Sequence, residues 1–167
     1  MLAEVVRSTR EKALEIAGLR RQVLERLGPR LTACAAALAA AFRAGGRLFA
    51  FGNGGSCTDA QAVACLFATG GPGGRPLPAL ALAEDAALVT ALGNDVGFEM
   101  VFARRIAALG ARGDVALALS TSGGSVNVRR GLQAARRRGM VTVGLAGSGG
   151  GTMAEPGLVD HLLLVPS

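Results

Sequence analysis

The sequence predicts an α/β fold in which a doubly wound parallel β-sheet lies between two layers of helices. Half of the 167 residues are hydrophobic and 18% are charged, which is typical of a chain that buries a sizeable core. From Arg47 onwards, short apolar runs alternate with amphipathic segments of helical spacing. Each run is followed by glycine, serine or acidic residues, as expected where a buried parallel strand ends in a loop.

The N-terminal part is predicted to form two helices, at about 2–27 and 30–44. Apolar residues recur from Leu2 to Leu27 at near-helical spacing with charges between them. We place a break at Pro29, because proline lacks the backbone donor and clashes with the preceding turn. The second helix is alanine-rich and apolar nearly all round, which predicts packing on two sides, and Gly45-Gly46 is its expected C-cap.

The remainder of the chain contains five candidate strands and four candidate helices. The strands are expected at 48–51, 78–83, 114–119, 140–145 and 161–165, and the helices at 57–68, 86–92, 98–109 and 126–138. Strand–helix–strand units connect through right-handed crossovers, and ligands of such sheets bind beyond the carboxyl ends of the strands. At this length we predict a single domain, 1–167, with N-terminal helices (1–44) and an α/β core (45–167).

The first strand leads directly into a glycine-rich loop, Gly52 to Ser56. Its glycines let the backbone approach a ligand closely, and Ser56 can cap the next helix while its hydroxyl faces an anion. Asp59 follows Ser56 by three residues, the spacing of a capping box, so we interpret it as structural. This loop is a candidate anion site.

The second loop, Ser120 to Ser125, repeats the arrangement and has four hydroxyls in six residues. Hydroxyls and first-turn amides together can satisfy the oxygens of a phosphate without a lysine. Neither loop matches the Walker or the dinucleotide-binding motif. A phosphomonoester is therefore the predicted ligand.

Composition restricts the classes of partner. The net charge is +6, but the basic residues are mostly scattered and the chain has no Trp or Tyr for base stacking, so nucleic acid is disfavoured. The three cysteines form no C-x-x-C motif and are interpreted as reduced thiols, which predicts a cytoplasmic protein. The longest apolar stretch, Leu31 to Phe42, is too short to span a bilayer, so no membrane partner is expected.

Motifs along nearly the whole chain resemble the sugar isomerase (SIS) domain, and within it the phosphoheptose isomerases, which interconvert sedoheptulose 7-phosphate and a heptose 7-phosphate. The motifs, in family order, are F-G-N-G-G-S, D-A-Q, A-L-G-N-D-V-G-F-E, S-T-S-G-G-S-x-N and R-R-G-M. The resemblance implies a flavodoxin-like, five-stranded parallel sheet. It also implies a homotetramer in which the N-terminal helices pack between subunits.

The resemblance further implies which residues hold the sugar phosphate. The phosphate would be surrounded by Ser56, Ser120, Thr121, Ser122 and Ser125, next to Gly54 and Gly55 of the first loop. Asn53 and the Asn94-Asp95 pair would reach the sugar hydroxyls, although Asn94 and Asp95 could instead form a plain turn.

The chain departs from the family where the chemistry is expected. In the family a His and a Glu on the helix after the first loop serve metal binding and proton transfer, but those positions are Ala62 and Leu66 here. The ligands of the family's zinc ion are therefore not present, and the general base is unidentified. Candidate carboxylates near the strand ends are Asp59, Glu84, Asp85, Asp95 and Glu99. The only histidine, His161, is interpreted as structural.

The family's remaining Gln and His lie on a helix beyond the last strand, and this sequence stops at Ser167. We therefore expect that this closing helix is missing and that the sequence is a fragment of a longer gene product. Three functions stay open, with the isomerase ranked first. The second is a non-catalytic SIS module that senses a sugar phosphate or binds a partner such as a replication initiator, and the third is one SIS half of a larger aminosugar-phosphate enzyme.

Overall fold

A five-stranded, all-parallel sheet forms the centre of the structure. The computed structural model describes residues 1–166. The strands are β1 (Leu48–Gly52), β2 (Ala79–Ala81), β3 (Val115–Ser120), β4 (Val141–Ala146) and β5 (His161–Leu164). Their order in the sheet is β2-β1-β3-β4-β5, which is the flavodoxin-like order of doubly wound proteins. The predicted fold class is confirmed.

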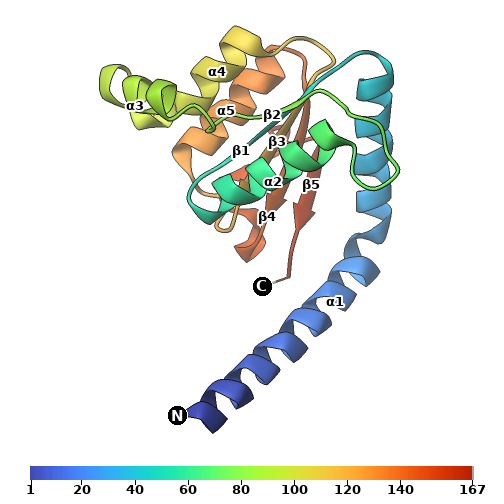
Figure 1. Cartoon of the computed structure of the whole chain (residues 1–167). Coiled ribbons are helices and arrows are strands. Elements are labelled where there is room, and N and C mark those ends of the chain that lie inside the picture. Colours follow the sequence, from blue (N-terminus) through green and yellow to red (C-terminus); the bar gives the residue numbers. More distant parts are fainter. Residues whose placement is uncertain (167) are drawn as a thin grey trace.

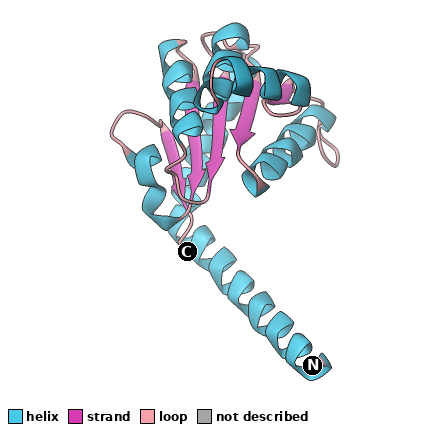
Figure 2. Ribbon diagram, turned by 90° about the vertical axis from the view of Figure 1, so that its left-hand side faces the viewer, coloured by secondary structure: helices cyan, strands magenta, loops and turns pink. Residues whose placement is uncertain are grey.

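Helices cover both faces of the sheet (Figures 1 and 2). They are α1 (Leu2–Arg43), α2 (Gly55–Thr69), α3 (Ala86–Asp95), α4 (Val101–Leu109) and α5 (Val126–Arg137). Two short 3₁₀ segments, η1 (Phe98–Met100) and η2 (Ser148–Ala154), complete the elements. The four helices predicted after the first strand are found, whereas η2 was not expected from its glycine-rich sequence.

Three apolar clusters hold these layers together. On one face, Leu48, Val115 and Val143 of the strands pack with Cys34 and Ala41 of α1. On the other face, β1 and β3 pack against α4 and α5, with Phe51 and Phe102 in contact at a ring-centroid separation of 5.1 Å. The sheet is buried on both sides, which explains why its strands are apolar at consecutive positions.

The N-terminal segment is one helix and not two. α1 runs without interruption through Pro29, so the predicted break between 27 and 30 is wrong. A proline removes one hydrogen bond of the helix, and the surrounding turns persist, since Thr32 donates its hydroxyl to the Gly28 carbonyl oxygen at 3.1 Å. Figure 1 shows that the helix changes direction part-way along, as a proline kink produces.

The two halves of α1 differ in their burial. Leu27, Cys34 and Ala41 repeat every seven residues and are buried, and Cys34 and Ala41 pack on the sheet. The first half extends beyond the sheet (Figure 1) and exposes large apolar side chains, among them Leu2, Val5, Val6, Leu14, Ile16 and Leu24. None of the helices within residues 1–166 is both long and apolar enough to cross a membrane.

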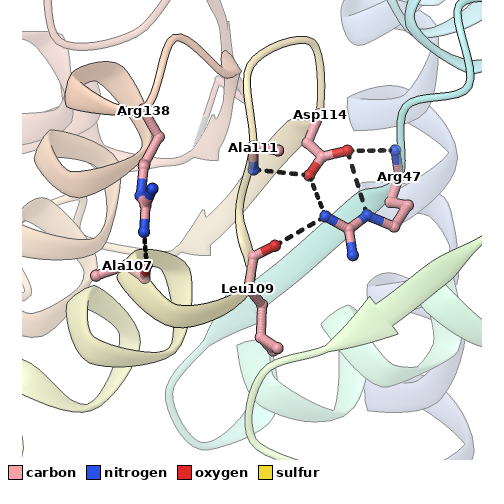
Figure 3. A network of polar contacts seen from close by, with 6 residues as sticks. All are labelled: Arg47, Ala107, Leu109, Ala111, Asp114 and Arg138. Atoms are coloured by element: carbon pink, nitrogen blue, oxygen red, sulfur yellow. Dashed lines mark hydrogen bonds and ion pairs between the residues drawn. The ribbon is translucent and has the colours of Figure 1, made fainter.

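A partly buried ion pair joins the starts of β1 and β3 (Figure 3). The Asp114 carboxylate accepts hydrogen bonds from the Arg47 guanidinium at 2.8 Å, the Arg47 backbone N–H at 2.8 Å and the Ala111 N–H at 2.9 Å. Burial by itself raises the pKa of Asp114, but the hydrogen bonds and the charge of Arg47 outweigh it, so the pKa lies below its ordinary value. Arg47 also donates to the Leu109 carbonyl oxygen, which ties the end of α4 to this network.

We predict that Asp114→Asn lowers the free energy of unfolding at neutral pH by about 1–3 kcal/mol, because three donors lose their charged acceptor. A depressed pKa stabilises the fold above the ordinary Asp value of 3.8, and that stability is lost as the pH falls through the folded pKa. In urea unfolding between pH 3 and 7, the free energy of unfolding should therefore fall less on acidification for Asp114→Asn than for the wild type. The control is Glu155→Gln, at an exposed residue, which should change stability by less than about 0.5 kcal/mol.

Candidate functional site

The two serine-containing loops lie side by side because β1 and β3 are neighbours in the sheet. Gly52, the last residue of β1, pairs with Leu119, next to the end of β3. A β-carbon at Gly52 would lie 2.6 Å from the Leu119 carbonyl oxygen and 2.8 Å from Cβ of Ser56. Only glycine therefore lets the chain turn from β1 into α2 this close to β3.

A cavity of about 260 Å³ opens beyond the carboxyl ends of β1, β3 and β4. The loop after β1 contributes Ser56 to it, and the loop after β3 contributes Ser120 and Thr121. The sequence did not point to the third contribution, Gly147 and Ser148, which follow β4. The signal was available, since these residues also follow a buried strand, where ligands of such sheets bind.

The start of α2 differs from the prediction. The helix begins at Gly55 with Gly54 as its N-cap, at φ 55°, and Ser56 already lies inside the first turn. The N-cap makes no side-chain hydrogen bond, so the predicted capping box of Ser56 and Asp59 is wrong. The difference arises from the positive φ of Gly54, a conformation that favours glycine, which lets the helix start two residues earlier than predicted. Ser56 and Asp59 both line the cavity instead, at the positive end of the helix dipole.

The hydroxyls of the second loop have different environments. Ser120 is buried, and its Oγ accepts a hydrogen bond from the Gly123 N–H at 3.1 Å. The Ser122 Oγ accepts from the Gly124 N–H at 3.3 Å. Ser125 is the N-cap residue of α5. The structure thus brings Ser56, Ser120 and Thr121 to one cavity, while Ser122 and Ser125 lie outside its lining.

The residues expected to reach the sugar lie in two different parts of the structure. The Asn53 side chain faces Asn127 of α5 and forms two hydrogen bonds of 2.8 Å with it. Asn94 and Asp95 are exposed at the end of α3, where Asn94 Nδ2 donates to Asp95 Oδ1 at 2.8 Å. Within one chain, Asn94 and Asp95 do not line the cavity beside the serine loops.

Segment η2 supports the second loop from the side of β4. The Gly123 carbonyl oxygen accepts hydrogen bonds from the Thr152 hydroxyl at 3.0 Å and from the Met153 N–H at 3.1 Å. Gly123 has φ 65° and its α-carbon lies against the backbone of Gly150, which itself has φ 85°. The loop conformation therefore depends on two glycines that approach each other without side chains.

The five candidate carboxylates are distinguished by their partners. Asp85 caps α3 by accepting from the Leu88 N–H at 2.9 Å, and Glu99 pairs with Arg130 at 3.5 Å. Asp95 accepts from its neighbour Asn94, and Glu84 is exposed outside the cavity lining. Asp59 is the one carboxylate among the residues that line the cavity.

The described residues do not fit a zinc ion at this site. Ala62 and Leu66 follow Asp59 on α2 and carry no donor atoms. Between residues 1 and 166, no group of three or more His, Cys, Asp or Glu side chains lies close enough to hold a metal ion. His161 begins β5 and is half-buried there.

Comparison with known proteins defines the class of this protein. The family model described as "SIS domain" matches residues 13–147. This range contains β1 to β4 and both serine loops. The chain belongs to the SIS-domain family.

Within that family, the chain is homologous to phosphoheptose isomerases. It is 44% identical over 150 residues to that of Roseiflexus sp., covering 89% of this chain and 75% of the relative. It is 48% identical over 140 residues to that of Pelobacter propionicus, covering 83% and 73%. The phosphoheptose isomerase structure from Neisseria gonorrhoeae has 34% identity and a TM-score of 0.89, covering 100% of this chain and 87% of that chain.

We predict that Gly123→Ala disturbs the cavity, whereas Gly124→Ala does not. The new methyl group at residue 123 would overlap the Gly150 carbonyl group and require a strained positive φ, whereas at Gly124 its nearest neighbour is Ser122 Oγ at 3.8 Å. Gly123→Ala should lower the free energy of unfolding by about 2 kcal/mol or more. Thermal unfolding of both variants tests this, and equal melting temperatures would contradict the close approach of Gly123 and Gly150.

Proposed function

We propose that this chain binds sedoheptulose 7-phosphate and a heptose 7-phosphate and interconverts them. The observation that carries the proposal is the cavity formed by both serine loops, in a chain more than 40% identical to phosphoheptose isomerases. In this assignment the phosphate lies against Ser56, Ser120 and Thr121. Ser122 and Ser125 would complete the ligand set through a modest adjustment of the loop.

The physical case for a phosphate comes from charge and donors. The N-terminal turn of α2 carries backbone N–H groups without intrahelical partners, and the helix dipole adds a partial positive charge. The hydroxyls of Ser56 and Thr121 supply further donors at the same cavity. Such a combination binds a phosphomonoester without a lysine.

The isomerisation itself requires the transfer of a proton between neighbouring carbons. A base removes a proton from C1 of the ketose, the C–H electrons form the C1=C2 bond of an enediol, and the C2 oxygen gains a proton. Return of a proton to C2 and loss of the C1 hydroxyl proton give the aldose. We assign the base to Asp59, because it is the carboxylate of the cavity lining.

A second candidate function is a SIS module that binds the sugar phosphate without converting it. The observation that favours it is the pair Ala62 and Leu66 on α2, which can neither bind a metal nor transfer a proton. The serine loops are independent of these two positions, so ligand binding would persist without turnover.

We further propose that the protein acts in the cytoplasm as a homotetramer built through α1. The three cysteines are free thiols, as expected for a reducing compartment. The first half of α1 exposes apolar residues to solvent, and packing against the same helix of other copies would bury them.

The isomerase proposal predicts turnover by the wild-type chain and its loss in Asp59→Asn. Each protein is incubated with sedoheptulose 7-phosphate, with and without added zinc, and the aldose is measured. Removal of the general base should reduce kcat at least about 100-fold and leave the affinity for the sugar phosphate unchanged.

The control for this assay is Glu84→Gln, an exposed carboxylate outside the cavity lining, which should keep full activity. Turnover that survives in Asp59→Asn would contradict the assignment of the base. Absence of turnover in the wild type, together with a rise in melting temperature on adding the ligand, would support the second candidate function instead.

The tetramer proposal predicts a mass of about four chains in light scattering. Replacing two exposed residues, Leu14→Glu and Leu24→Glu, should give smaller species, because charges would then face the neighbouring helices. Thr58→Glu, at an exposed position of α2, adds a charge away from α1 and serves as the control. A wild-type monomer would contradict the role given to α1.

A further inference from the structure

A reciprocal pair of side-chain amides connects the first loop to the beginning of α5. Asn53 Nδ2 donates to Asn127 Oδ1 and Asn127 Nδ2 donates to Asn53 Oδ1, both at 2.8 Å. Asn127 Oδ1 also accepts from the Val128 backbone N–H at 2.9 Å. We infer that this pair sets the separation of the two serine loops and thereby the affinity for the phosphate group, an inference that rests on the proposed function.

Burial makes the two amides dependent on each other. Asn127 is 3% exposed, and Asn53 is half-buried. A buried amide without a hydrogen-bonding partner is costly, so either side chain retains this position only while the other is present. Two hydrogen bonds that run in opposite directions fix both the orientation of the first loop and its distance from α5.

The pair joins the two segments that carry the proposed phosphate ligands, although neither asparagine lines their cavity. Asn53 precedes Ser56 by three residues, and Asn127 follows Ser125 by two. On its other side the second loop is held by Thr152 and Met153 of η2. The two loops are therefore connected to each other by the amides, while η2 supports the second loop from outside.

This position makes Asn53 and Asn127 positioning residues for the ligand. A phosphate shared by two loops binds best when its donors are already at the right separation, because no ordering cost is then incurred on binding. The Asn53 amide nitrogen has a second hydrogen and its oxygen a second lone pair, so Asn53 can still contact a sugar hydroxyl.

The inference is tested with Asn53→Ala, Asn127→Ala and the double variant. Binding of inorganic phosphate and of sedoheptulose 7-phosphate is measured by calorimetry well below each melting temperature. Each single variant should bind about tenfold more weakly, the effect of one or two net hydrogen bonds. The double variant should also lose about tenfold and not a hundredfold, because the pair acts as one unit.

Thr142→Ala controls for a general loss of stability. Thr142 is a fully buried polar residue, hydrogen-bonded to Asp160 at 2.9 Å near the start of β4, away from the carboxyl ends of the strands. It should lower the melting temperature but leave both affinities unchanged.

Each outcome decides between the proposals. Weaker binding in all three asparagine variants, with a coupled double variant, supports the inference. Wild-type affinity in variants that have merely lost stability, or additive losses in the double variant, would overturn it while leaving the proposed function intact. A wild type that binds neither ligand overturns the proposed function as well. If Asn127→Ala does not fold, the affinity of Asn53→Ala for inorganic phosphate decides alone, because Asn53 is half-buried in a loop and inorganic phosphate has no sugar hydroxyl for it to contact.

Discussion

The parallel pairing of β1 with β3 is the constraint on which the rest of the structure depends. Residues 48–52 pair in register with 115–119, so both strands end at the same height. The Arg47–Asp114 ion pair fastens them at the opposite end. Because each strand is followed at once by a loop, this single alignment places the first turn of α2 and the start of the loop after β3 on one cavity. Small shifts in the pairing would separate Ser56 from Ser120 and Thr121.

Much of this architecture could be predicted from local patterns. The five strands are recognisable because both faces of the sheet are buried, which leaves consecutive apolar residues, and the serine loops stand out because they follow such strands. The break predicted at Pro29 was wrong because a proline weakens a helix only locally, and the packing of Cys34 and Ala41 on the sheet cannot be inferred from that residue. Ser56 was mistaken for a cap because the conformation of Gly54 depends on its surroundings.

The site was less predictable than the fold, because its contacts join residues far apart in the chain. Asn127 lies 74 positions from Asn53, and neither has a property in the sequence that indicates the other. Similarly, η2 was missed because consecutive glycines resemble a flexible linker. The serine loops are complete although α2 carries Ala62 and Leu66. The two serine loops therefore match the family's motifs, while positions 62 and 66 do not.

The exposed first half of α1 has a consequence for how the protein folds. An isolated helical segment in water is marginal unless an amphipathic face is covered, and here the covering surface is not supplied by the sheet. If other copies supply it, then coil-to-helix conversion of these residues and assembly are a single equilibrium. The helical content of the chain would then depend on its concentration, and newly made subunits would complete their secondary structure only on meeting one another.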